Sequence, residues 1–474
     1  MFKRASILFV LILVFSDFSY GQQVIAKDTL EKKGITHLKA FSSGLVQNIL
    51  LNRVNRHLIP TGRDWANVNF STWKETLTTA PSWDWDLFTT NWFAHPYQGS
   101  MFYNGARNLG LSFYESTIYS VTGTLVWEFM GETYPASTND LFTNIIGGFH
   151  LGEILYRLSE NVLDDRAVGS ERLRREVLAG MININGSLNR VIYGKAFDKN
   201  LHMGHERIPI KKLFYISNAL SIQHPQNKTN ISNPLIGLKL KYGDYSKPNP
   251  NISPYDYFDL STWVRLDFDV NSDNVTSHHF KAFFNLSSHA IIYGDFKKTI
   301  HGNNILTGIF QHYDYFKNDD FELGSFALTY GYIFESPEKK TRLNLQAGPI
   351  ILAAADSKST DHVRPKEYVN AIMRDYVMGS GINTKFEISK TFFNKINISF
   401  NHGYWMLFSL SGVDGTETIH RFSGELGYDV SPVLNISLSL LNHYSAGDYE
   451  EEEYIFKDGE RYSDFKIGAS ITLK

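Results

Sequence analysis

The sequence contains no cysteine, so the chain forms no disulfide, has no cysteine to carry a lipoprotein anchor and cannot bind zinc through thiolates. Long hydrophobic runs are also missing, and the mean hydropathy of −0.24 is too low for a bundle of membrane-spanning helices. Any metal site would need histidine and carboxylate ligands.

Signatures of the familiar soluble enzymes are absent too. The chain has no phosphate-binding glycine loop, no Gly-x-Ser-x-Gly elbow and no His-Glu-x-x-His zinc motif. Lysine and arginine total 46 against 49 aspartate and glutamate, which argues against a general attraction to nucleic acid. Partner recognition must therefore come from local sites.

The first residues have the pattern of an export signal. Lys3 and Arg4 precede an apolar run over residues 5–15, and small residues follow at 19–21. We expect residues 1–21 to be a cleaved signal peptide and the mature chain to begin at Gln22. The alternative is an uncleaved anchor helix, but this run is shorter than the ~20 residues that a spanning helix needs.

The C-terminal part alternates with the period of a β-strand. Phe326, Leu328, Tyr330, Tyr332 and Phe334 share one phase and small or polar residues the other, and 434–440 and 465–473 repeat the pattern. Aromatic residues make up 14% of the chain, as suits membrane barrels. The candidate strands are 212–222, 234–244, 257–270, 278–294, 303–316, 321–335, 341–354, 377–391, 395–409, 417–430, 433–445 and 461–474. This pattern predicts a transmembrane antiparallel β-barrel of about 12 strands over residues 212–474.

The segments outside these strands have a less regular pattern, which predicts only their general structure. Residues 22–82 show no sustained period and are expected to be a loosely structured periplasmic lead-in. Residues 83–195 are expected to be helical, with helices near 111–132, 140–164 and 171–193, and Ser137 is a candidate cap. The charged segments 356–367 and 445–460 are interpreted as extracellular loops; solvated loop tips are favoured over a cation or receptor site.

One predicted helix carries a polar stripe. Hydroxyl and carboxylate side chains recur every fourth residue at Ser112, Ser116, Ser120, Thr124, Glu128 and Glu132. Such a stripe fits a helix packed in a polar barrel lumen or against another helix, because carboxylates facing lipid are costly.

The helical region also contains a distinctive order of motifs: Trp85-Asp86, His95-Pro96-Tyr97-x-Gly99-Ser100, Trp127-Glu128, Asn139-Asp140 and Gly147-Gly148-x-His150-x-Gly152-Glu153. Over roughly residues 83–195 it resembles an outer-membrane family, common in Bacteroidota, that is catalogued only as a domain of unknown function (DUF3943). The resemblance implies an exported barrel protein of a Gram-negative bacterium and implies no reaction.

Two hypotheses cover the polar residues of this region. In the first, the helix with the polar stripe supplies hydrogen-bond partners for inward-facing residues of the barrel. In the second, His95, Glu128, Glu132, Asp140, His150 and Glu153 form one catalytic or metal site, since His150 and Glu153 share a helix face and Glu128 and Glu132 are four residues apart. Arg157 offers Glu153 an ordinary salt bridge. Ser100 is a weak candidate nucleophile, and the identity of any metal or cofactor stays open.

These observations predict an α+β membrane protein in which an N-terminal helical domain plugs or caps a C-terminal barrel. The leading function is envelope structure, binding or limited transport in the outer membrane; the alternative is an enzyme acting on envelope lipid or glycan through the His/carboxylate site. Outer-membrane lipid, the barrel-assembly machinery and a small-molecule or lipid ligand are the expected partners.

Overall fold

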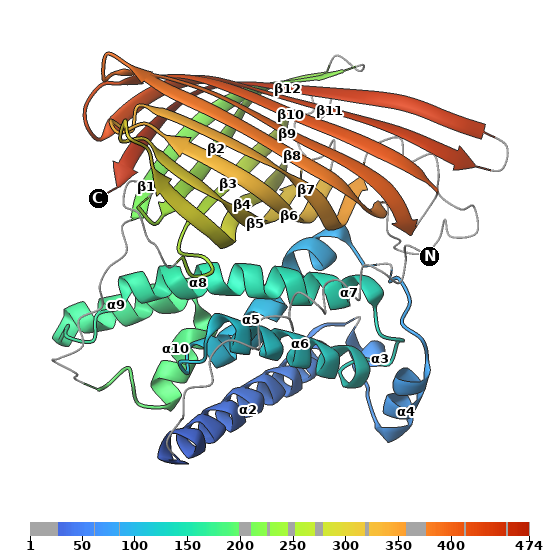
Figure 1. Cartoon of the computed structure of the whole chain (residues 1–474). Helices are drawn as coiled ribbons and strands as arrows, with labels where there is room; N and C mark the ends of the chain where they lie inside the picture. The colour runs from blue at the N-terminus through green and yellow to red at the C-terminus, as the bar shows by residue number, and fades with distance from the viewer. Residues whose placement is uncertain are drawn as a thin grey trace. The chain divides into compact units, whose positions relative to one another are not determined.

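The computed structural model describes residues 27–60, 62–84, 86–198, 210–224, 228–244, 252–270, 278–317, 322–356, 376–411, 414–451 and 454–473. The expected signal peptide and most of the 356–367 segment lie outside these residues. The chain divides into two compact units, Met1–Arg207 and Ile208–Lys474, and Figure 1 shows helices in the first and strands in the second.

The second unit is a closed antiparallel barrel. Its strands are β1 (Ile210–His224), β2 (Lys228–Tyr242), β3 (Phe258–Val270), β4 (His278–Lys298), β5 (Asn304–Lys317), β6 (Glu322–Glu335), β7 (Thr341–Asp356), β8 (Val377–Phe392), β9 (Ile396–Ser411), β10 (Gly415–Asp429), β11 (Leu434–Glu451) and β12 (Tyr454–Leu473). Each strand pairs with its neighbours in sequence, and β1 pairs with β12 to close the ring. Closure leaves no unpaired sheet edge, which a barrel in lipid requires. The predicted twelve-stranded barrel is confirmed.

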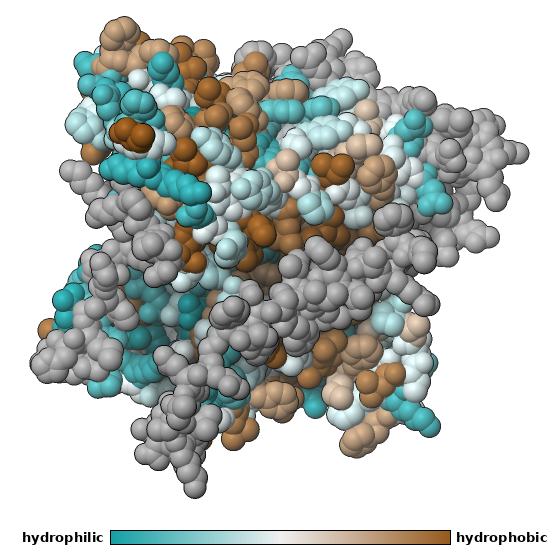
Figure 2. Space-filling model, viewed as in Figure 1, coloured by the Kyte–Doolittle hydropathy of each residue, from teal (hydrophilic) through white to brown (hydrophobic). Residues whose placement is uncertain are grey.

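The two faces of the strands differ as the alternation predicts. On β11, Leu438 is 53% exposed, while its neighbours Ser437 and Ser439 line a cavity inside the barrel. Ser437 pairs with Gly427, and Ser439 pairs with Glu425 on β10, so the polar phase continues across strands. Figure 2 shows hydrophobic residues, in brown, among polar ones on the visible outer surface.

One loop prediction is wrong. The segment 445–460 was expected to be an extracellular loop, but β11 and β12 continue through most of it as a paired hairpin, from Ser445↔Glu460 to Glu451↔Tyr454. Strand pairing needs only backbone groups, so a segment rich in charged residues can still pair.

The first unit consists of helices: α2 (Lys27–Leu58), α3 (Gly62–Trp65), α4 (Phe70–Thr78), α5 (His95–Arg107), α6 (Phe113–Met130), α7 (Thr138–Phe142), α8 (Gly148–Val162), α9 (Gly169–Ile182) and α10 (Ile184–Ile192), with π-helical segments η1 (Thr90–Ala94) and η2 (Thr143–Gly147). The described helices include none long and apolar enough to cross a membrane. The expectation of a loosely structured segment over 22–82 is wrong, since α2, α3 and α4 occupy most of its described part.

Capping residues explain where several helices begin. The Ser112 hydroxyl accepts from the Glu115 amide and the Glu115 carboxylate accepts from the Ser112 amide, which starts α6 with a capping box. Ser137 caps α7 as predicted, accepting from the Asp140 amide. The helix predicted over 171–193 is interrupted at Asn183, whose side chain caps α10.

Glycines let α5 and α8 approach each other closely. A Cβ placed on Gly99 would lie only 1.8 Å from the Asn144 carbonyl oxygen, and Gly148 lies directly against Gly99. Any side chain at these positions would push the two helices apart. The close crossing brings the start of α5, which carries His95, next to η2.

Candidate functional site

The interior of the helical unit is polar. Ser116, Ser120, Thr124 and Glu128, four members of the polar stripe, are buried on one face of α6. The Ser120 hydroxyl donates to the Asn144 carbonyl at 3.3 Å, so the stripe packs against η2 and the neighbouring α5. This confirms that the stripe packs against other helices.

His95 lies at the junction of η1 and α5 and meets several of the predicted residues. Its Nε2 is 3.3 Å from Asp140 Oδ2 and 3.7 Å from Asp86 Oδ2. Its Nδ1 is 3.3 Å from the side-chain amide of Asn144 on η2. Single π-helical turns of this kind are rare and often occur at functional sites. The ring is therefore fixed from two sides by side chains of separate segments.

Asp84 is the hub of this cluster and was not among the predicted site residues. It accepts hydrogen bonds from Asn139 Nδ2 at 2.7 Å, from Ser137 Oγ at 3.0 Å and from Asn91 Nδ2 at 3.1 Å, and it shares a further hydrogen bond with Asp140. Its position directly before the Trp-Asp pair is the only sequence signal that pointed to it.

Burial and charge fix the protonation states of the cluster. Burial alone lowers the pKa of His95, but the hydrogen bond to Asp86 and the charges of Glu128 and Asp84 outweigh it and raise the pKa to about 9. Burial tends to raise the pKa of Asp84, yet the hydrogen bond with Asp140 and the charge of His95 lower it. Burial and the charge of Asp84 raise the pKa of Asp140 well above its usual value. Burial and the neighbouring carboxylates therefore favour the protonated form of Asp140, whereas the partners of Asp84 favour its charged form.

Glu128 and Glu132 belong to the edge of the same cluster. Glu128 Oε2 accepts from the Ser137 amide at 2.9 Å, and its Oε1 has no hydrogen-bond partner among the described residues. Burial, with repulsion from Glu132, raises the pKa of Glu128 to about 8. Burial raises the pKa of Glu132 to about 7, against the opposing charge of His95. Both carboxyl groups therefore bind protons more strongly than an exposed glutamate does.

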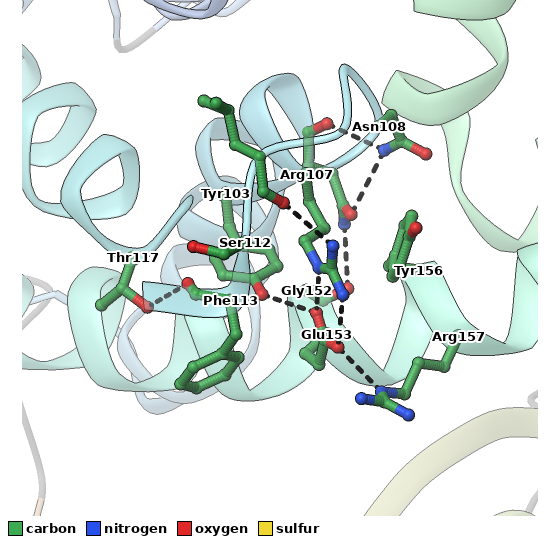
Figure 3. A network of polar contacts seen from close by, with 12 residues as sticks. Tyr103, Arg107, Asn108, Ser112, Phe113, Thr117, Gly152, Glu153, Tyr156 and Arg157 are labelled. Carbon is green, nitrogen blue, oxygen red and sulfur yellow. Dashed lines mark hydrogen bonds and ion pairs between the residues drawn. The ribbon is translucent and has the colours of Figure 1, made fainter. Parts of the chain in front are cut away.

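Glu153 has a different set of partners (Figure 3). Its carboxylate accepts from Tyr103 Oη at 2.6 Å, from Arg107 Nε at 2.8 Å and from Arg157 Nε at 2.8 Å. Arg107 also donates to the Leu111 carbonyl and stacks on the Tyr156 ring. This arrangement clamps α5 to α8 through one buried carboxylate.

The remaining candidates have structural partners. His150 is fully buried on α8, and the Ser100 hydroxyl donates to the Tyr97 carbonyl at 2.6 Å. Within the part of the chain that the structure describes, no three His, Asp or Glu side chains are arranged to hold a metal ion.

A second polar network crosses the barrel lumen. Lys241 on β2 lies 3.8 Å from Asp259 on β3 and 3.9 Å from Glu387 on β8. Arg342 on β7 donates to Asp259 at 2.9 Å, and Lys385 on β8 donates to Asp314 on β5 at 2.7 Å. Lys241 and Asp259 lie opposite each other on neighbouring strands. The other three pairs join strands that are not neighbours in the sheet, so they cross the space inside the barrel.

The chain thus combines a closed antiparallel barrel with a helical domain that has a polar interior. Residues 80–184 match the model of a family described as a domain of unknown function (DUF3943). This match confirms the resemblance inferred from the motifs of the helical region. No curated protein matches the chain.

Several solved barrels are similar to the chain. Outer membrane phospholipase A from Escherichia coli is 9% identical with a TM-score of 0.28, over 55% of this chain and 89% of that one. The KdgM porin is 10% identical with a TM-score of 0.23, over 55% and 99%. The beta domain of the Bordetella autotransporter BrkA is 11% identical with a TM-score of 0.26, over 56% and 99%. The assignment of the fold rests on the strand pairing described above.

Proposed function

We propose that this protein resides in the outer membrane of a Gram-negative bacterium, as the resemblance to the Bacteroidota family implied, and binds a small polar solute in a barrel that its own side chains close. Support for the location comes from the closed barrel and from exposed apolar side chains such as Leu438 and Ile436 on its outer face. An export signal over residues 1–21 and insertion by the barrel-assembly machinery belong to the same proposal.

The single observation that carries the proposal is the bridge made by Lys241. Glu387, its partner on β8, lies six strands away around the ring, on the opposite wall of the barrel. Arg342 and Asp259 form a second bridge beside it, at 2.9 Å. Ion pairs that reach from wall to wall obstruct free diffusion through the lumen, because a solute must break or bypass them.

The space that remains is a cavity of about 500 Å³, a size typical of small-molecule sites. Positively and negatively charged side chains line it in equal number: Lys239, Lys241, Lys385 and Arg421, and Asp259, Asp314, Glu387 and Glu425. Serine hydroxyls and the rings of Tyr215, Trp263 and Trp405 also line it. Balanced charge, hydroxyls and aromatic faces favour a neutral, hydroxyl-rich solute.

Ion conductance in planar bilayers tests the closed lumen. The wild-type protein should conduct weakly, and Lys241→Ala should conduct more because it removes the wall-to-wall bridge. Lys297→Ala is the matched control, since Lys297 is exposed and pairs with Asp295 close by on the same strand. A wild-type protein that conducts as a wide, water-filled pore would contradict the proposal, as would equal conductance of the two variants.

A titration tests the ligand. The fluorescence of Trp263 and Trp405 should change when maltose, as a neutral disaccharide, is added in a detergent without sugar headgroups. Trp263→Phe with Trp405→Phe should lose that response, while Trp73→Phe in α4 should keep it. A signal that does not respond to maltose, or that survives the double change, would reject a hydroxyl-rich ligand in the lumen.

The enzyme alternative has less support than binding. His95, Glu128 and Asp140 are all buried within the helical unit, and their polar atoms face one another. A substrate would have to displace this packing to reach them. We propose that the cluster holds α5, α6 and α7 together.

A further inference from the structure

The helix α2 has its polar and apolar faces reversed relative to a soluble protein. Asn48 is only 5% exposed and donates to the Gly123 carbonyl at 3.1 Å, and Asn52 donates to the carbonyls of Ala66 and Gly131 at 2.9 Å each. The outward side chains are apolar instead: Leu38, Leu45, Val46, Ile49 and Leu50 are exposed, Ile49 at 51%. No ionisable side chain occurs between Ala40 and Asn52.

The helix α10 shows the same reversal. Asn189 is 5% exposed and donates to the Gly105 carbonyl at 3.1 Å, and Arg190 is buried against Glu176 and Asp165. Ile184, Leu188, Val191 and Ile192 point outward, and Leu188 is 52% exposed. A helix at the surface of a soluble domain normally buries its apolar residues and exposes its polar ones.

The neighbouring α9 repeats the pattern with charged residues. Arg172 and Glu176 pair at 3.0 Å and are turned toward the unit, where Glu176 also holds Arg190. Leu173, Val177 and Met181 are exposed. The C-terminal end of α10 lies beside α2, because Lys39 Nζ on α2 is 4.8 Å from the centre of the Tyr193 ring. We call the exposed apolar side chains of α2, α9 and α10 the apolar face.

From this reversal we infer that the apolar face binds a lipid surface, with the helices lying in the interface of the membrane that the barrel spans. A lipid surface accounts for both halves of the pattern: it covers exposed apolar side chains, and it requires polar groups to find partners inside the protein. A protein partner would explain only the first half. The barrel of the proposed function supplies the membrane, so the inference rests on that function.

The dimensions and charges of α2 also fit a helix that lies in the interface. At 1.5 Å per residue, its uncharged stretch from Ala40 to Asn52 is about 20 Å long, shorter than the ~30 Å hydrocarbon core. Exposed Lys39 and Arg53 flank that stretch. In such a position the long basic side chain of Arg53 reaches toward lipid headgroups while its neighbours enter the apolar layer; Lys39 lies over the Tyr193 ring.

Single cysteine labels on the full chain test the inference cleanly, because the protein has no cysteine of its own. Leu45→Cys and Leu188→Cys place an environment-sensitive fluorophore on the apolar face, and Lys74→Cys on the exposed side of α4 is the aqueous control. Leu438→Cys reports on barrel insertion. Each variant is reconstituted in phosphatidylcholine vesicles that contain a spin-labelled lipid as quencher, and iodide is the aqueous quencher.

We expect lipid quenching and a blue-shifted emission at residues 45, 188 and 438, and iodide quenching at residue 74. If residue 438 is quenched by lipid while residues 45 and 188 respond to iodide, the inference is wrong and the membrane barrel stands. Protection of 45 and 188 from both quenchers would identify a second copy or another part of the chain as the occupant, which also overturns it. If residue 438 is not quenched by lipid, the barrel assignment itself fails.

Discussion

The buried carboxylate of Glu153 offers the sharpest test of how the helical unit is held together. Glu153→Gln keeps the shape of the side chain and removes its charge. Oε1 of Glu153 accepts from Arg157 and from Arg107 Nη2, and Oε2 accepts from Tyr103 and from Arg107 Nε. In either orientation, the amide nitrogen of glutamine would face a guanidinium donor. At least one bond becomes a contact between two donors, and two partly buried arginines lose the charge of Glu153.

Removing one partner of a buried ion pair costs about 3–5 kcal/mol, because the remaining charge stays buried and unpaired. Glu171→Gln is the matched control. Glu171 also binds two arginines, Arg174 at 2.8 Å and Arg175 at 2.7 Å, but its side chain is 43% exposed while that of Glu153 is fully buried. An exposed pair of this kind contributes only ~0–1 kcal/mol.

Urea unfolding in detergent micelles, followed by the helical circular dichroism signal, measures the difference. The helical signal reports on the first unit, so a barrel that stays folded does not obscure it. We expect Glu153→Gln to lower the free energy of unfolding by about 3–5 kcal/mol and Glu171→Gln by less than ~1 kcal/mol. Equal losses in the two variants would refute the argument that burial makes the Glu153 clamp strong.

Three further predictions follow from the charge and packing described above. The pKa of Glu128 is raised to about 8, so ionisation of Glu128 opposes folding, and the pKa of His95 is raised to about 9, so the stabilisation by protonated His95 is complete below about pH 6.5 and is lost as the pH rises through 9. Thermal melts of the helical signal should therefore show Tm falling between pH about 6 and about 9, and falling less steeply in Glu128→Gln. A Tm that rises over this range would contradict the assignment. Leu438→Arg should destabilise the inserted barrel by ~2–4 kcal/mol if it lies near mid-membrane, and Ser437→Arg by less, as measured by urea unfolding in vesicles; equal losses would reject the register. Gly99→Ala should destabilise the helical unit by at least ~1–3 kcal/mol, whereas Gly44→Ala, with open space around it, should stabilise it by ~0.5–1 kcal/mol; similar melts for the two would contradict the close crossing.

The barrel was predictable from the sequence because its signal has a simple period. On a strand such as β11 one face is turned to the lumen and the other outward, so residues such as Leu438 and Ser437 alternate in kind. The predicted span 303–316 became Asn304–Lys317, and 321–335 became Glu322–Glu335. Ends were less predictable: β11 extends to Glu451, beyond the predicted end at residue 445.

The candidate site was predictable only in part, because its members come from separate segments. His95 and Asp140 are far apart in sequence and meet through the close crossing of α5 with η2, which depends on the glycine contact at Gly99. Asp84 precedes the first predicted helix and enters the cluster through the side chains of Asn139 and Ser137. Periodicity carries no information on such contacts, whereas the cap at Ser137 is a local feature and was found.

The failure to predict α2 has a specific physical cause. A helix is recognised in sequence by an apolar stripe that faces a core, and α2 turns Ala40, Asn48 and Asn52 toward the unit. Its apolar residues spread over the wider outer face, so the usual contrast between a narrow apolar side and a broad polar side is lost. The same reasoning applies to α10, where Asn185 and Asn189 face inward. A helix is expected to carry its polar residues in a narrow stripe where its surroundings are apolar. The quenching experiment at residues 45 and 188 tests whether α2 and α10 have apolar surroundings.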